Sequence, residues 1–424
     1  MVDNIMKIAL FYYDSFKTEG GISHVLECLI KTFKKTDHKI YLFNLNYRSK
    51  FTFELIEKRN SSQLIKILKK KNFYRFLFIS FLKIIKDKQI PFLDRLRLLL
   101  YFVVKPNILL NTINNIIHIY PLIKKIDVDL ILGGATCGDT LTLIFTISRI
   151  LNKKVASLTY GNDFLVHSPL SLRTFYIRNL DLIIFGTHSL KRIFKKIHPV
   201  KDSRLKVIRY GLILKNYKIT KDKEELRQEL NIPKDKFILL SVGRHVPRKN
   251  FDLVIRAIHH IKQQKPDIKI KYYLIGSGPE TPHLRELTKE LYLEDEVQFL
   301  GFVDKNTRNK YYKISDVFTM PSTIKRESIE GFGIVFLEAN YYKIPVIGTL
   351  SGGIIEAIID GKTGFLIKPN DINELIEKIL YFYENPEKRK KIGNQGYERV
   401  INEFNWNKII FEYISHFQNL LKEI

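Results

Sequence analysis

Two glutamates, Glu330 and Glu338, stand eight residues apart and enclose the turn Gly331-Phe332-Gly333. The glycines permit a tight backbone and a close approach by a ligand, and residues 334–342 predict a buried helix. A helix entered through such a turn points free N–H groups at whatever lies before it, which suits a phosphate. Carboxylates on either side accept hydrogen bonds from hydroxyls, so the stretch favours a phosphate flanked by polyols, as in a nucleotide sugar. The same residues also fit a plain helix N-terminus whose acidic groups complement the helix dipole.

Arg244 and Lys249 lie five residues apart in the stretch GRHVPRKN, directly after a predicted strand at residues 237–242. Two cations across a loop can hold two phosphates, the arginine through its planar fork and the lysine as a point charge. By itself such a pair is ordinary surface chemistry. Because a phosphate site is expected at Gly333 in the same half of the chain, we interpret the pair as a candidate diphosphate clamp.

The elements that must position these residues alternate between strands and helices along the whole chain. The alternation predicts two doubly wound α/β halves with parallel sheets, and glycines follow most of the strands. We expect the connection between the halves at residues 210–222. The expected strands lie at residues 7–12, 39–43, 129–132, 154–158, 182–185 and 206–208 in the first half, and at 237–242, 270–275, 297–300, 317–320, 345–347 and 364–367 in the second.

Two places in the first half are also candidates for ligand contacts. Gly20 and Gly21 follow the first strand and open a helix predicted at residues 22–33, although a glycine pair also fits an ordinary tight turn. The stretch Thr159-Tyr160-Gly161-Asn162-Asp163 follows the strand at 154–158. Polar groups beyond the carboxyl end of a parallel strand occupy the usual ligand position of such sheets.

The size and composition exclude several classes of protein. The chain has 424 residues, 45% of them hydrophobic, which is enough for two or three domains with real cores. Its two cysteines are too few for a disulfide framework or a cysteine-based metal site, so a reducing compartment is expected. The N-terminal residues do not form a signal peptide, and no stretch reaches the roughly 20 apolar residues of a membrane span. We therefore expect a protein that is soluble or bound to a membrane surface.

The net charge of +26 predicts an anionic partner: a nucleic acid, an anionic membrane surface or a phosphorylated ligand. A general lysine bias of the source proteome would give the same charge. Residues 48–125 form a predicted helical insertion that carries 17 Lys and Arg against four Asp and Glu. Lysines beside bulky apolar residues, as at Lys69-Lys70-Lys71, favour a helix in a lipid interface over a merely solvated basic face. Asp127 and Asp129 have the D-x-D spacing of a metal–diphosphate site. They precede an apolar strand, however, whereas ligands of a parallel sheet bind beyond the carboxyl ends of its strands.

With these motifs in place, the chain resembles the retaining glycosyltransferases of family 4, which have the GT-B architecture. The matching stretches are SVGRHVPRKN, LIGSGPE, VQFLGFV, ISDVFTMPS, IEGFGIVFLEAN, IPVIGTLSGGIIEAI and DGKTGFLI. The resemblance implies an acceptor-side Rossmann-like domain at 1–215, a nucleotide-sugar-binding domain at 216–404, a cleft between them, and a C-terminal helix at 405–424 that crosses back to the first domain. The stretch IEGFGIVFLEA looks most like the phosphatidyl-inositol mannosyltransferase branch, which favours GDP-mannose as donor.

The resemblance also implies roles for single residues. Arg244 and Lys249 should hold the donor diphosphate, Glu338 the ribose hydroxyls and Glu330 the hydroxyls of the donor sugar. Catalysis should rest on Arg244, Lys249 and Glu330. The remaining expected donor contacts are Gly21, Phe302, Val303, Gly333 and Ile334, while Tyr160, Asn162 and Asp163 are expected on the acceptor and sugar side.

The sequence departs from the family at three positions. Tyr160 stands where the family often has a histidine, Ile355 where it usually has a proline, and Asn250 where it usually has a glycine. At the first of these positions a phenol replaces the imidazole that the family often places near the reacting sugar.

The overall expectation is a retaining transfer by front-face departure and attack, without a cofactor or a metal. The sugar would move from GDP-mannose or a UDP-sugar to a lipid-linked or polysaccharide acceptor in cell-envelope glycan synthesis. The protein would be cytoplasmic and peripheral at the inner face of the membrane. A sugar-nucleotide epimerase or a glycogen-type synthase could share the two-domain form. A basic nucleic-acid- or anion-binding protein without transferase activity is the alternative from another class, but no compact recognition motif supports it and we expect no nucleic acid.

Overall fold

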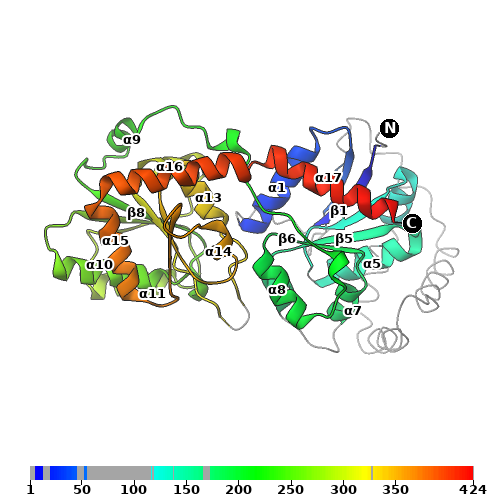
Figure 1. Ribbon diagram of the computed structural model, residues 1–424, viewed down its shortest axis with the longest axis horizontal. Helices are drawn as coiled ribbons and strands as arrows, with labels where there is room; N and C mark the ends of the chain where they lie inside the picture. The colour runs from blue at the N-terminus through cyan, green and yellow to red at the C-terminus, as the bar shows by residue number, and fades with distance from the viewer. Residues whose placement is uncertain are drawn as a thin grey trace. The chain divides into compact units, whose positions relative to one another are not determined.

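The computed structural model describes residues 5–12, 20–44, 52–54, 116, 119–136, 138–165, 172–325 and 328–423. The chain divides into two compact units. The first contains Met1–Ile208 together with Ile410–Ile424, and the second contains Arg209–Ile409. The expected domain limits at residues 215 and 404 lie a few residues from these borders. Helix α17 (Trp406–Lys422) begins in the second unit and belongs to the first from Ile410 onward (Figure 1).

The first unit is built on a seven-stranded sheet with the order β3-β2-β1-β4-β5-β6-β7. All neighbouring strands are parallel except β3, which runs antiparallel to β2 at the edge. The strands are β1 (Lys7–Tyr12), β2 (Lys39–Asn44), β3 (Thr52–Glu54), β4 (Leu130–Gly133), β5 (Lys154–Thr159), β6 (Leu182–Phe185) and β7 (Leu205–Val207). The helices connecting them are α1 (Gly21–Phe33), α5 (Gly138–Leu151), α6 (Asn162–Leu165), α7 (Leu172–Arg178) and α8 (His188–Ile197), with the short turn η2 (Asp202–Arg204).

The second unit has a six-stranded, fully parallel sheet with the order β10-β9-β8-β11-β12-β13. Its strands are β8 (Phe237–Val242), β9 (Ile270–Ile275), β10 (Val297–Gly301), β11 (Val317–Thr319), β12 (Val346–Thr349) and β13 (Gly364–Ile367). Its helices are α9 (Lys223–Glu229), α10 (Phe251–Gln264), α11 (Thr281–Glu290), α12 (Lys305–Ile314), α13 (Ile334–Tyr341), α14 (Ile354–Ala357), α15 (Ile372–Glu384) and α16 (Pro386–Glu403), with the turns η3 (Leu214–Tyr217) and η4 (Pro247–Lys249).

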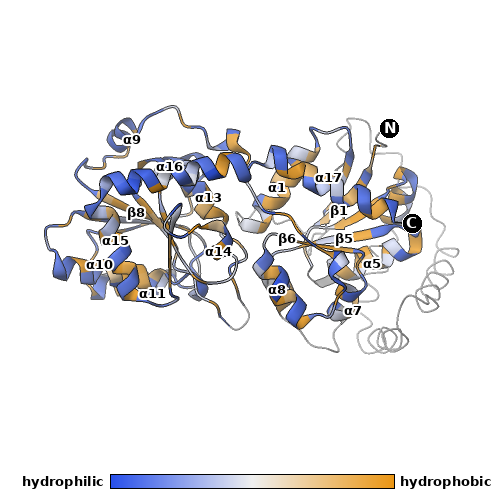
Figure 2. Ribbon diagram, in the orientation of Figure 1, coloured by the Kyte–Doolittle hydropathy of each residue, from blue (hydrophilic) through white to orange (hydrophobic). Residues whose placement is uncertain are grey.

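Both sheets are doubly wound, which confirms the fold class expected from the alternating pattern. The strand order reverses between β1 and β4 in the first unit and between β8 and β11 in the second. The central strands β1, β4, β6 and β8 are almost entirely buried, because helices cover both faces of a parallel sheet and its strands read as continuous apolar runs. Figure 2 shows the labelled strands β1 and β8 largely in the hydrophobic colour, while the helices carry many hydrophilic residues.

The structure describes only part of the predicted helical insertion in the first unit. Within the predicted helical insertion at 48–125, residues 52–54 form the edge strand β3 and not a helix, so that part of the prediction is wrong. Thr52 and Phe53 are residue types common in strands, and the segment pairs antiparallel with β2 at the sheet edge. Residues 119–125 are helical, as expected. Most of the segment, including Lys69-Lys70-Lys71, lies outside the described residues. Among the helices that the structure describes, none is long and apolar enough to cross a membrane.

The connection expected at 210–222 belongs to the second unit and is partly buried. Tyr217 is fully buried in η3, and Gly211 packs so closely on the backbone of Phe404 that an added Cβ would lie 2.3 Å from its carbonyl oxygen. The backbone of Leu212 bonds to Phe404 and to Trp406. The chain therefore enters the second unit along a fixed path beside the end of α16.

Candidate active site

The loops that follow β8 and β11 meet at the point where the strand order of the second sheet reverses. In an open α/β sheet such a switch point is the usual ligand position, because the loops on either side of it lead to opposite faces. The loop after β8 contains Arg244, Arg248 and Lys249, and the loop after β11 leads through Met320 to Glu330. The contact of Lys249 Nζ with the Met320 sulfur, at 3.0 Å, joins the two loops.

Glu330 is held by two cations on a single oxygen. Lys249 Nζ lies 2.5 Å from Glu330 Oε2, and Arg248 Nη1 pairs with the same oxygen. Arg248 Nε also donates to Ser328 Oγ at 2.9 Å. All three charged side chains are largely buried, with 11 to 15% of each exposed. Glu330 Oε1, in contrast, has no partner among the residues that the structure describes, so one oxygen is neutralised and the other is left to accept a hydrogen bond.

The cations keep Glu330 ionised. Burial alone would raise the pKa of this carboxyl, but the charges of Lys249 and Arg248 outweigh burial and lower the pKa to about 2. Burial lowers the pKa of the Lys249 ammonium, and the nearby charge of Arg248 lowers it further, against the opposing effect of Glu330. The pKa of Lys249 thus moves downward mainly because of burial, whereas that of Glu330 moves downward because two cations favour the carboxylate. A carboxylate in this state is a hydrogen-bond acceptor and a poor proton acceptor near neutral pH.

Arg244, the other half of the predicted clamp, stands apart from this cluster. It is exposed on the same loop and makes no ion pair or hydrogen bond within the described part of the chain. The structure therefore pairs Lys249 with Glu330 and leaves Arg244 available for an anion. The sequence did not predict a role for Arg248. The one available signal was its position directly before Lys249. A basic pair in a 3-10 turn gives no indication of which carboxylate its members reach.

Glu338 lies inside the protein, in a network of aromatic hydroxyls. The hydroxyls of Tyr217 and Tyr312 donate to Oε1 and Oε2 at 2.9 Å each, and Arg308 Nη2 lies 3.6 Å from Oε1. Only 3% of Glu338 is exposed. The carboxylate thus ties η3, α12 and α13 together. Burial also raises the pKa of Tyr312 far above its usual range, which keeps this phenol a donor to Glu338.

The turn between the two glutamates has the conformation that its glycines suggest. Gly333 caps α13 with a φ of 80°, in the left-handed region, and a Cβ there would lie 2.7 Å from the Phe336 ring. Ile334 begins α13, so its amide belongs to the first turn, where helical N–H groups have no partner in their own helix. Gly353 N–H donates to the Glu330 carbonyl at 2.9 Å, so the loop after β12 fixes the backbone of this glutamate.

Asn250 stands where the family usually has a glycine, and its backbone conformation accounts for this departure. It has a φ of 57° between η4 and α10, again in the left-handed region. Asparagine tolerates this conformation better than most residues with a side chain. The position therefore keeps the backbone that a glycine would adopt. Phe302 and Val303 follow β10 at the sheet edge, where Phe302 is 67% exposed, and no described contact links either residue to the two glutamates.

In the first unit, Asp163 connects the loops that follow β4 and β5. Its Oδ1 accepts from the Thr159 hydroxyl and from the amides of Tyr160 and Gly161, at 2.9 to 3.0 Å. Its Oδ2 accepts from the amide and the hydroxyl of Thr136, at 3.1 and 2.5 Å. Five donors occupy this carboxylate, so it holds two loops in place.

The remaining candidate residues of the first unit are exposed, have side chains outside the described residues or make only local contacts. Gly21 begins α1 and is exposed. Asn162 begins α6, and its side chain lies outside the described residues. Asp127 pairs with Lys153 at 3.0 Å, and Asp129 accepts from the amide of Lys7 at 2.8 Å, so both aspartates act locally before β4. No group of His, Cys, Asp or Glu in the described part of the chain is arranged to hold a metal.

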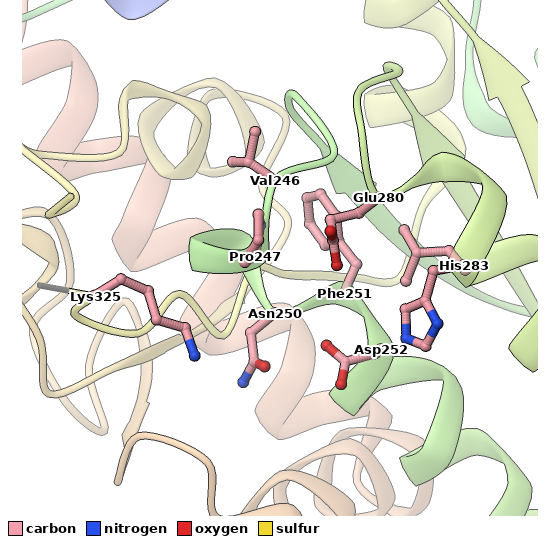
Figure 3. A pocket seen from close by; sticks show the side chains of 9 residues that line it. Val246, Pro247, Asn250, Phe251, Asp252, Glu280, His283 and Lys325 are labelled. Carbon is pink, nitrogen blue, oxygen red and sulfur yellow. The ribbon is translucent and has the colours of Figure 1, made fainter. Parts of the chain in front are cut away.

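A pocket of about 170 Å³ lies beside the loop between β8 and α10, which we call the clamp loop because it contains Arg244 and Lys249. Figure 3 shows Val246, Pro247 and Asn250 from that loop on one side of the pocket and Glu280 and His283 from the region of α11 on the other. Neither Glu330 nor Arg244 lines it. The pocket is therefore separate from the charged cluster, although both share the loop between β8 and α10.

Comparisons with known proteins show which chains this one is similar to. Residues 222–399 match the family model described as glycosyl transferases group 1. The N-acetyl-alpha-D-glucosaminyl L-malate synthase of Bacillus anthracis is 28% identical over 275 residues, which is 64% of this chain and 69% of the relative. A GDP-mannose-dependent alpha-(1-6)-phosphatidylinositol monomannoside mannosyltransferase of Mycolicibacterium smegmatis is 28% identical over 174 residues, 41% of this chain and less than half (45%) of the relative.

The fold also matches solved structures. The Anabaena protein HepE, solved in complex with UDP and glucose, superimposes with a TM-score of 0.66 at 18% identity, covering 98% of this chain and 100% of the other. At this level of identity the similarity concerns the fold alone. It confirms the GT-B architecture expected for the two α/β units.

Proposed function

We propose that the chain, whose residues 222–399 match the family model of the group 1 glycosyl transferases, transfers a hexose with retention from a nucleotide-diphosphate sugar to a lipid-linked or polysaccharide acceptor. The observation that carries this proposal is the Glu330 cluster at the switch point of the second sheet. It offers one carboxylate oxygen that has no partner among the described residues, while Arg244 is exposed on the loop after β8 and Ile334 opens the first turn of α13. These groups match the two halves of the donor, with hydroxyls for the carboxylate and a diphosphate for the cation and the amides.

The chemistry follows from the charge of the cluster. The bond between the anomeric carbon and the leaving diphosphate breaks, a bond to the acceptor oxygen forms on the same face, and the acceptor proton passes to the leaving phosphate oxygen. Arg244 and the amides of the α13 N-terminus stabilise the charge that develops on the diphosphate. Glu330 is ionised and paired, with a pKa of about 2, so it orients the sugar through Oε1. Lys249 contributes its charge through the same cluster.

Three further features of donor binding are expected: a contact from Glu338, a contact from Phe302 and a preferred nucleotide. A bond between Glu338 and the ribose would form beside the hydroxyls of Tyr217 and Tyr312, which each occupy one oxygen of the carboxylate, or would replace one of them. Phe302, exposed after β10, is a candidate to border the base. The names of relatives support both GDP-mannose and other donors, and GDP-mannose is our first choice from the wording of the motif around Glu330.

The acceptor is proposed to approach the first unit. Asp163 fixes the backbone of Tyr160 and Gly161 beyond β5, which leaves this loop to shape the acceptor side. Residues 172–208 carry nine Lys and Arg against two Asp. Asp202 pairs with Lys191 and Lys195, so an excess of cations stays on this part of the unit. Such a surface favours an anionic or lipid-linked acceptor and a peripheral position at the inner face of the membrane.

A donor panel tests the proposal. Release of nucleoside diphosphate from GDP-mannose, UDP-glucose and UDP-N-acetylglucosamine is measured with membrane lipid extract as acceptor, for wild type, Arg244→Ala and Arg256→Ala. Arg256 is an exposed cation of α10 and serves as the matched control. We expect one donor to be used and Arg244→Ala alone to impair its use. Failure of every donor, or equal effects of both variants, contradicts the proposal. Binding of nucleic acid without donor turnover favours the alternative class.

We further propose that transfer needs no metal ion, because Arg244, Lys249 and the helix amides already supply positive charge at the diphosphate. Activity in EDTA should equal activity in buffer. Loss of activity in EDTA that Mn²⁺ or Mg²⁺ restores would refute this part of the proposal.

A further inference from the structure

Arg248, on the loop between β8 and α10, is held through both its side chain and its backbone. Its guanidinium contacts two acceptors of one segment, Glu330 Oε2 through Nη1 and Ser328 Oγ through Nε at 2.9 Å. Its backbone carbonyl accepts from the amide of Thr323 at 2.8 Å. Only 15% of the side chain is exposed. Arg248 therefore links the loop after β8 to the segment that carries Glu330, through both backbone and side chain.

The two cations on Glu330 contribute differently to its geometry. The lysine ammonium is a point charge that neutralises Oε2 from many directions, whereas the arginine fork is planar and directional. Because a second arm of the fork is held by Ser328, the guanidinium cannot follow the carboxylate if it rotates. The direction of Oε1, the oxygen without a described partner, is then set by Arg248 more than by Lys249.

We propose that Arg248 is a positioning residue for sugar transfer, which aims Glu330 Oε1 at a hydroxyl of the donor sugar without itself holding the diphosphate. The inference rests on the proposed function and adds a residue to it. The inference also assigns different functions to two arginines of the same loop. Arg244 serves the diphosphate directly, and Arg248 serves the sugar through Glu330.

This division predicts a dissociation between two ligands. A nucleoside diphosphate lacks the sugar, so its affinity should not depend on how Glu330 is aimed, while use of the intact donor should. Removal of one charge-assisted hydrogen bond corresponds to about a tenfold loss or more. The acid limb of the activity profile should also move to higher pH, since loss of one cation lets Glu330 bind a proton more readily.

The experiment compares wild type with Arg248→Gln, Arg248→Lys, Ser328→Ala and the control Arg256→Gln. Donor KM, kcat and their pH dependence are measured by nucleoside diphosphate release, and the Kd of the nucleoside diphosphate is measured by calorimetry. We expect Arg248→Gln to raise donor KM about tenfold or more with its Kd for the nucleoside diphosphate within about twofold of wild type. Arg248→Lys keeps the charge but loses the fork and should recover part of the loss. Ser328→Ala should give a smaller change in the same direction.

Two outcomes overturn the inference. A parallel rise of donor KM and nucleoside diphosphate Kd in Arg248→Gln would show a direct phosphate contact, and no change in either would show a merely structural arginine. If Arg248→Gln does not fold, Arg248→Lys and Ser328→Ala test the same dissociation. Normal donor use by Arg248→Gln beside impaired use by Arg244→Ala overturns this inference alone. If wild type uses no donor, the proposed function fails as well.

Discussion

Glu338 offers the sharpest test of the tertiary structure, because it looks like a ligand contact in the sequence and is a buried anchor in the fold. The change is Glu338→Ala. It removes the acceptor of two buried phenols, Tyr217 and Tyr312, and the partner of Arg308. It also leaves a cavity where the carboxylate stood. The matched control is Arg244→Ala, which removes an exposed cation that has no described partner.

The expected loss follows from the hydrogen bonds. A bond to a charged group contributes roughly 1.5–3 kcal/mol, and two such bonds are lost together. We therefore expect Glu338→Ala to lower the free energy of unfolding of the second unit by roughly 3–6 kcal/mol. Tyr217→Phe and Tyr312→Phe should each lose roughly 1–3 kcal/mol. Arg244→Ala should stay within about 0.5 kcal/mol of wild type, as is usual for exposed positions.

The chain provides its own probe. Trp406 is the single tryptophan, fully buried and within the second unit, so its fluorescence reports the unfolding of that unit. With a slope of about 2 kcal/mol per molar urea, the midpoint of Glu338→Ala should fall by roughly 2 M. A midpoint equal to that of wild type would show that Glu338 is not the anchor described, and an equal fall in Arg244→Ala would show that the probe does not resolve the two sites.

Three further predictions concern other residues. The pKa of Glu330 is lowered from 4.5 to about 2, so its stabilisation is present above pH 4.5 and lost as the pH falls towards 2. Wild type should therefore lose about 3 kcal/mol more than Glu330→Gln across that range, measured by urea unfolding at each pH. Asn250→Gly should unfold within about 0.5 kcal/mol of wild type and Asn250→Val should lose about 1–2 kcal/mol, because only valine is strained at a φ of 57°; equal midpoints would contradict the strain argument. Asp163→Asn places an amide before donors that need an acceptor, so hydrogen exchange at Gly161 should speed up, and unchanged exchange would refute the role of Asp163 as the tie between two loops.

Much of the fold could be predicted from the sequence because its signals are local. Buried parallel strands are continuous apolar runs, and glycines mark their carboxyl ends, so β1, β6, β8, β9 and β13 begin and end at the expected residues. The short strand β3 was missed, since three residues are too few to show a period and its pairing with β2 is a contact across the sheet edge.

The candidate site, too, could be predicted only in part from the sequence. The sequence by itself determined that Glu330, Glu338, Arg244 and Lys249 share one half of the chain and that a glycine turn opens α13, because these are matters of spacing and backbone freedom. Only the tertiary structure decided the state of each group. Tyr217 reaches Glu338 across 121 positions, and Arg248 reaches Glu330 across 82. Burial and charge pairing at such separations depend on how the sheet brings its loops together, and no local pattern of residues encodes them.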